Sequence, residues 1–135
     1  MNNSVSVFQI PQLKDNYSYL LVKDNKAIIV DPAESFSILE LIKSKKFIVE
    51  AILITHHHSD HTAGIKNILN LYKVPVYTPS KNIYGTSNVI SDKQLIKFSF
   101  INFKVLETPG HTLDHVVYYN KKNNILISGD TLFRL

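Results

Sequence analysis

The chain has 135 residues, of which 44% are hydrophobic, so it is long enough to bury the core of one globular unit. It contains no cysteine, which excludes disulfides and thiolate metal ligands. Lysine and arginine outnumber aspartate and glutamate by 15 to 11, but the basic residues are scattered, so we expect a solvated surface that suits a small anionic substrate and no nucleic-acid partner.

The amino terminus has neither the basic start nor the apolar centre of a signal peptide. No stretch of the sequence is long and apolar enough to span a bilayer. We therefore predict a cytoplasmic protein that has no membrane partner.

The first half of the chain alternates between short apolar strands and helices. Antiparallel strands are predicted at residues 5–10, 17–22 and 27–30, joined by the polar turns Asp15-Asn16 and Asp24-Asn25. A helix is predicted over residues 35–45, with Phe36, Leu39, Ile42 and also Ile38 as inward-facing candidates.

A histidine-rich segment follows the apolar, β-branched strand predicted at residues 51–54. It reads Thr-His-His-His-Ser-Asp-His over residues 55–61, and a second helix is predicted over residues 64–72, with Ile65, Ile68, Leu69 and Tyr72 inward. The histidines thus lie on a strand-to-helix loop, where α/β sheets place their ligands.

The spacing within this segment suits two cations. His56 and His58 flank one residue and project the same way from an extended turn, so they can bind one cation. Asp60 and His61 lie at the helix start and point towards a neighbouring cation position. The alternative interpretation is a solvated histidine tract or structural histidines bonded to backbone carbonyls.

The second half is rich in strands, two of which end in further metal-binding residue types. Strands are predicted at residues 74–78, 93–98, 101–106, 115–119 and 125–128, with a loop-rich stretch over residues 82–92. His111 follows the strand at 101–106 in a Pro-Gly turn, and Asp130 follows the strand at 125–128. Either residue alone is most often structural, but three strand ends that each carry a ligand type favour a metal site.

Three segments together resemble the metallo-β-lactamase superfamily: residues 55–61, residues 109–112 (Pro-Gly-His-Thr) and residues 129–133 (Gly-Asp-Thr-Leu-Phe). The segments at 13–20 (Leu-Lys-Asp-Asn-Tyr-Ser-Tyr-Leu) and 29–32 (Ile-Val-Asp-Pro) are similar to the hydroxyacylglutathione hydrolase, or glyoxalase II, branch. The resemblance implies an α/β (α+β) fold, a partial αββα sandwich of mixed sheets flanked by helices.

The resemblance also implies a set of site residues. His56, His58 and His111 match ligands of a first metal, Asp60 and His61 match ligands of a second, and Asp130 matches a bridging carboxylate. Asp60 is also the candidate catalytic residue. Two divalent metals are expected, with zinc as the default and iron or manganese as alternatives. The implied reaction converts S-lactoylglutathione to lactate and glutathione by attack of metal-bound hydroxide.

Asp31 precedes Pro32 at the end of the strand over residues 27–30, so a capped turn is its simplest explanation. In the family that the chain resembles, the corresponding aspartate lies beneath the metal loop. A carboxylate there orients a ligand histidine and fixes its tautomer. Both interpretations of Asp31 stay open on the sequence alone.

Members of the hydroxyacylglutathione hydrolase branch, which this chain resembles, continue beyond the Gly-Asp-Thr-Leu-Phe segment. They have another ligand histidine and a helical domain that holds glutathione. We therefore expect residues 1–135 to form one truncated domain, to lack that helical domain, and to self-associate through an exposed edge. The alternatives are a non-catalytic metal-binding remnant or interaction module, and another hydrolase or a sulfur dioxygenase of the superfamily.

Overall fold

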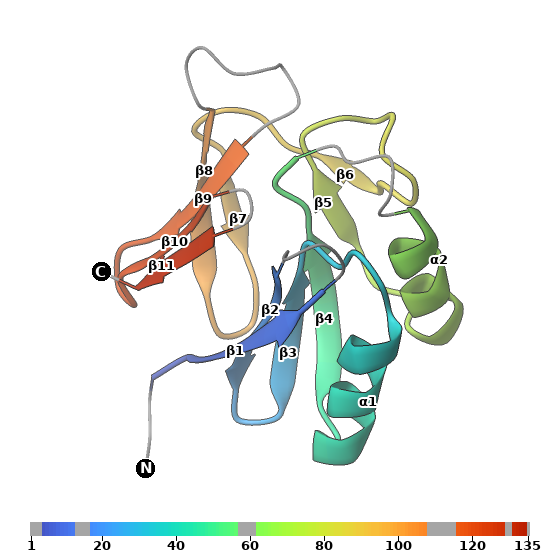
Figure 1. Ribbon diagram of the computed structural model, residues 1–135. Coiled ribbons are helices and arrows are strands. Elements are labelled where there is room, and N and C mark those ends of the chain that lie inside the picture. Colours follow the sequence, from blue (N-terminus) through green and yellow to red (C-terminus); the bar gives the residue numbers. More distant parts are fainter. Residues whose placement is uncertain (1–3, 13–16, 57–61, 108–115, 129–130, 135) are drawn as a thin grey trace.

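The structure of the protein is a computed structural model that describes residues 4–12, 17–56, 62–107, 116–128 and 131–134. Within these ranges, eleven strands and two helices form two sheets and one helical layer (Figure 1). The first sheet has the order β1-β2-β3-β4-β5-β6, and the second has the order β11-β10-β9-β8-β7. The helices cover the outer face of the first sheet, and the second sheet faces its other side (Figure 1).

The first sheet begins as an antiparallel meander and continues as parallel strands. β1 pairs with β2 and β2 with β3 in antiparallel fashion, whereas β3, β4, β5 and β6 are successively parallel. The two helices lie in the crossovers between β3 and β4 and between β4 and β5. The elements are β1 (Ser6–Pro11), β2 (Tyr17–Lys23), β3 (Lys26–Val30), α1 (Phe36–Lys45), β4 (Ile48–Leu53), α2 (Thr62–Leu71), β5 (Val76–Thr78) and β6 (Asn88–Val89).

The second sheet is antiparallel throughout. Its strands pair in the order in which they follow one another along the chain, so the sheet has a meander topology. The strands are β7 (Leu95–Lys97), β8 (Asn102–Glu107), β9 (Val116–Asn120), β10 (Ile125–Ser128) and β11 (Thr131–Arg134).

Consecutive apolar residues in the central strands enter two different cores. Leu20, Ile29 and Ile52 pack towards the helices, while their neighbours Leu21 and Ile28 pack towards the second sheet. Successive side chains of a strand point to opposite faces, so a strand covered on both sides needs an uninterrupted apolar run. This requirement explains the apolar runs in β3 and β4 and leaves polar residues for the strand ends.

The predicted α/β class is confirmed by this layering, and the described helical layer and two facing sheets agree with a partial αββα sandwich. The three predicted amino-terminal strands are antiparallel as expected, and both helices are present. The predicted turn Asp15-Asn16 lies outside the described residues. Two short strands, β6 and β11, were not predicted, because neither has a pattern of its own and each exists through pairing with a neighbour.

One core prediction is wrong. Phe36 is 69% exposed, whereas Ile38 and Ile42 are buried and Leu39 is partly buried. Ile38 and Ile42 are four residues apart and so share one face of α1, while Phe36 is only two residues from Ile38 and falls on the far side of the helix. The inward face of α1 is therefore set by the two isoleucines.

Gly85 lies in the loop between β5 and β6, where this loop packs against α2. Its φ is +81°, and a Cβ atom there would lie 2.8 Å from Cδ1 of Leu69. We expect Gly85→Ala to lower the free energy of unfolding by at least about 1–2 kcal/mol, because of the left-handed backbone and the contact with Leu69. Urea unfolding measures the change, and Lys81→Ala, at an exposed position of the same loop, is the control. Equal stability of the two variants would contradict this account of the loop.

Candidate functional site

Asp31 is a buried carboxylate directly after β3. Asp31 is only 5% exposed. Its φ is +48°, a left-handed backbone conformation that aspartate tolerates better than most residues. Its backbone N–H donates to the Leu53 carbonyl at 2.9 Å, and its own carbonyl accepts the Ser18 hydroxyl at 2.7 Å. The neighbouring strands β2 and β4 therefore hold Asp31 in this conformation.

The Asp31 side chain binds Thr55, which follows the end of β4. Oδ1 accepts the Thr55 backbone N–H at 2.8 Å, and Oδ2 accepts the Thr55 hydroxyl at 2.7 Å. Thr55 is fully buried, so both of these donors would be costly to leave without a partner. The two-point contact fixes the start of the segment that carries the predicted metal ligands.

The Thr55 hydroxyl also contacts His56, with 2.7 Å between Oγ1 and Nδ1. A hydroxyl has one hydrogen, and an ionised carboxylate can only accept, so Thr55 donates to Asp31 and accepts from Nδ1–H of His56. A neutral imidazole with its proton on Nδ1 has its lone pair on Nε2. The arrangement therefore selects the tautomer of His56 whose Nε2 can bind a cation.

The described strand ends that flank the other predicted ligand segments meet at Thr55. The backbone N–H of Val116, at the start of β9, donates to the Thr55 carbonyl at 2.8 Å. Val116 pairs with Glu107, the last residue of β8, and Val117 pairs with Ser128, the last residue of β10. The ends of β3, β4, β8 and β10 and the start of β9 thus come together at one edge of the two sheets.

Of the predicted site residues, the structure describes Asp31 and His56 and brings them together through Thr55. Across the described ranges, no group of three His, Cys, Asp or Glu residues is placed to hold a metal ion. The other predicted ligands lie outside the described residues: His58, Asp60, His61, His111 and Asp130.

Sequence reasoning missed two residues that act on this strand end. Thr55 appeared only as the first residue of the histidine segment, although a buried polar residue after an apolar strand is a signal for a specific partner. Tyr118 of β9 is fully buried, and its hydroxyl donates to the Ile54 carbonyl at 2.6 Å. Burial raises the pKa of Tyr118 well above its ordinary value, and the negative charge of Asp31 acts in the same direction.

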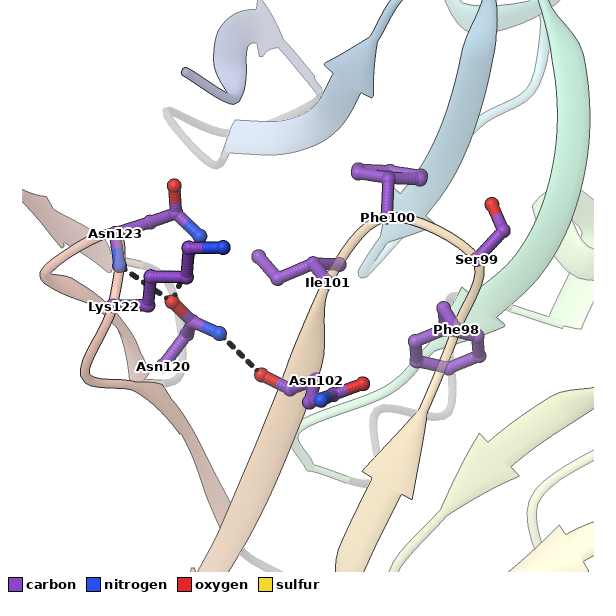
Figure 2. A pocket seen from close by; sticks show the side chains of 8 residues that line it. All are labelled: Phe98, Ser99, Phe100, Ile101, Asn102, Asn120, Lys122 and Asn123. Carbon is purple, nitrogen blue, oxygen red and sulfur yellow. Dashed lines mark hydrogen bonds between the residues drawn. The ribbon is translucent and has the colours of Figure 1, made fainter. Parts of the chain in front are cut away.

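A cavity of about 350 Å³ lies at the opposite end of the second sheet, beside the turns that follow β7 and β9 (Figure 2). Asn120 on its wall donates from Nδ2 to the Asn102 carbonyl at 2.5 Å and accepts the backbone N–H of Asn123 at 2.7 Å. The bond to Asn123 lies within the β9–β10 turn, and the bond to Asn102 joins the end of β9 to the start of β8 (Figure 2). Asn102 begins β8 and Asn120 ends β9, so this cavity lies a strand length from Thr55.

Residues 13–135 match the protein-family model described as the metallo-beta-lactamase superfamily. This range includes every predicted metal ligand as well as Asp31, Thr55 and Tyr118.

Curated relatives of similar sequence are named hydroxyacylglutathione hydrolase. The protein from Pectobacterium atrosepticum is 39% identical over 132 residues, which cover 96% of this chain and 52% of the relative. That from Francisella philomiragia is 42% identical over 120 residues, which cover 87% of this chain and 48% of the relative. The chain thus spans about half the length of the curated relatives that it matches.

Solved structures share the fold. The crystal structure of BLEG-1 B3 metallo-beta-lactamase superposes with a TM-score of 0.81 at 26% identity, covering 95% of this chain and 73% of that one.

Among the described residues, no helix is long and apolar enough to cross a membrane.

The raised pKa of Tyr118 predicts a specific loss of stability in alkali. Above the ordinary tyrosine pKa of about 10, the unfolded chain loses this proton while the folded protein keeps it, so the free energy of unfolding falls as pH rises further. In Tyr118→Phe this contribution is absent, and we expect a shallower alkaline decline in urea unfolding. Phe103→Leu, which changes a ring packed against Tyr118, should keep the wild-type pH slope. If the free energy of unfolding declined equally with pH in wild type and Tyr118→Phe, the raised pKa of Tyr118 would be refuted.

Proposed function

Because this chain belongs to the metallo-β-lactamase superfamily, we propose that it is a metal-dependent thioester hydrolase of the hydroxyacylglutathione hydrolase type. The observation that carries the proposal is the hydrogen-bonded unit Asp31–Thr55–His56, which sets a histidine at a strand end in the tautomer that binds a cation. The names of the curated relatives support the thioester substrate. The substrate proposed is S-lactoylglutathione, and the products are lactate and glutathione.

The residue types present fit a site for two divalent cations. Imidazole and carboxylate donors without thiolates suit zinc, and they also suit iron or manganese. His56, His58 and His111 would hold one cation, Asp60 and His61 the other, and Asp130 both. When bound, such a pair activates water and stabilises negative charge on the acyl oxygen. Asp60 is the catalytic carboxylate in this assignment.

Asp31 acts in this proposal as a positioning residue. It does not touch the substrate; it holds Thr55 by two hydrogen bonds, and Thr55 holds Nδ1 of His56. Partners of this kind fix the ring direction of a ligand histidine and raise its basicity. The turn at Pro32 and the positioning role are compatible, because the left-handed backbone of Asp31 is what aims its carboxylate at Thr55.

The overall charge is consistent with an anionic substrate. The formal net charge is +4, and glutathione thioesters carry carboxylates, so long-range attraction favours their approach.

In the reaction, water adds to the acyl carbon, the carbon–sulfur bond breaks, and the sulfur leaves as the thiol or thiolate of glutathione.

Metal content and turnover test the proposal directly. We expect untagged protein to bind two divalent metals per chain by elemental analysis and to hydrolyse S-lactoylglutathione. His58→Ala should remove the first metal, while Asp60→Ala should spare it and weaken the second. Equal loss of both metals in the two variants would indicate one coupled site. Metal binding without turnover would favour the alternative of a non-catalytic metal-binding module.

The positioning role of Asp31 and Thr55 has its own test. In Asp31→Asn an amide hydrogen can donate to the Thr55 hydroxyl, which then donates to Nδ1 of His56 and moves the ring proton to Nε2. We expect zinc affinity to fall by about 10 to 100-fold in Asp31→Asn and in Thr55→Val. Nitrogen chemical shifts of His56 in the metal-free protein report the tautomer.

Two matched variants complete this test. Thr55→Ser keeps the hydroxyl and should retain zinc affinity, and Asp24→Asn, in the exposed β2–β3 turn, should leave it unchanged. Wild-type affinity in Asp31→Asn, with an unchanged His56 tautomer, would reduce Asp31 to a turn residue.

A further inference from the structure

Tyr118 connects the second sheet to the strand that leads into the histidine segment. Its hydroxyl donates to the carbonyl oxygen of Ile54 at 2.6 Å, and the carbonyl oxygen of Tyr77 lies 3.3 Å away. Ile54 follows β4 and Tyr77 lies in β5, so one phenol reaches the carboxyl ends of two parallel strands in the other sheet. The side chain is fully buried, and the hydrogen bond to Ile54 is also buried.

The backbone of β9 makes a second contact with the same short segment. The N–H of Val116 donates to the Thr55 carbonyl at 2.8 Å. β9 therefore holds two consecutive carbonyls, those of Ile54 and Thr55, directly before His56. Fixing two successive peptide planes fixes the position of the Thr55 side chain between them, because the backbone has only two soft dihedral angles per residue.

We propose that Tyr118 is a positioning residue for the metal-binding segment, whose hydroxyl holds the Ile54 carbonyl so that Thr55 presents its own hydroxyl to both Asp31 and His56. The inference rests on the proposed function in so far as His56 binds a cation. It extends that function by giving the second sheet a part in setting the histidine. Tyr118 itself contacts neither substrate nor metal in this assignment.

The surroundings of Tyr118 suit a fixed hydrogen-bond donor. The ring packs edge-on against Phe103 with 6.1 Å between centroids, and Phe103 in turn packs against Phe98 at 6.4 Å. Aromatic packing of this kind holds the ring whether or not it carries a hydroxyl. Tyr118→Phe therefore removes the hydrogen bond to Ile54 while preserving the ring contacts.

A purely structural role for the hydroxyl makes a different prediction. If it only satisfies a buried carbonyl, its loss lowers global stability and leaves His56 unchanged. If it positions Thr55, its loss also loosens the Thr55 amide and weakens cation binding at His56. Measurements at Thr55 and His56 separate the two roles when they are compared at equal global stability.

The experiment compares Tyr118→Phe with two controls. Tyr119→Phe makes the same change at the next residue of β9, which is only partly buried and points to the opposite face of the strand. Ile42→Val removes a methyl group from the core beneath α1, remote from the second sheet, and supplies a comparison of reduced stability. Hydrogen exchange of the Thr55 amide in metal-free protein, relative to global unfolding, is the first readout. Zinc affinity by competition with a chromophoric chelator is the second.

We expect Tyr118→Phe to speed exchange of the Thr55 amide relative to global unfolding and to weaken zinc binding by about 10 to 100-fold, with neither effect in the controls. Exchange and affinity that match those of the controls would overturn the inference. If the wild type binds no zinc, the proposed metal function fails, and the exchange measurement alone decides the role of Tyr118: faster exchange supports it and unchanged exchange rejects it.

Discussion

The hydrogen bonds of Thr55 constrain the whole arrangement. This residue is fully buried where the two sheets meet, and its amide, hydroxyl and carbonyl are bonded to Asp31, His56 and Val116. A buried polar group without partners costs more than the hydrogen bond itself contributes. Thr55 can be buried here only if the residue after β3 supplies a carboxylate and β9 supplies an N–H. The hydrogen bonds of Thr55 therefore require the two sheets to be placed as they are, and they also help to hold the sheets in that placement.

The two apolar cores provide the scaffold, and the strand ends beside Thr55 carry the polar residues of the candidate site. Strands β3 and β4 are covered on both faces, which gives a rigid scaffold with close-packed cores on each side. The proposed chemistry therefore lies at the strand ends, where Asp31 and Thr55 are found. The ends of β3, β4, β8 and β10 and the start of β9 meet within a few hydrogen bonds of Thr55, so segments far apart in the sequence begin from one place.

The described residues form three layers, one of helices and two of sheet, and the chain spans about half the length of its curated relatives. In the second sheet β11 pairs with β10, and within the described part of the chain it has no second strand partner. Unpaired strand edges invite pairing with another strand. Self-association through such an edge remains a prediction.

The sequence by itself determined most of the strands, both helices and the close spacing of His56 and His58, because apolar periodicity and residue spacing are local properties of the chain. The fold class and the full set of candidate metal ligands were implied by the resemblance of short motifs to a known family. It failed at Phe36, where hydrophobicity alone did not show which face of α1 turns inward. The tertiary structure alone decided the partners of Asp31 and Tyr118, which lie 24 and 64 residues from the groups they bind. Those contacts depend on which strands pair and in what register, including the irregularity between β3 and β4, and no local pattern encodes such a pairing.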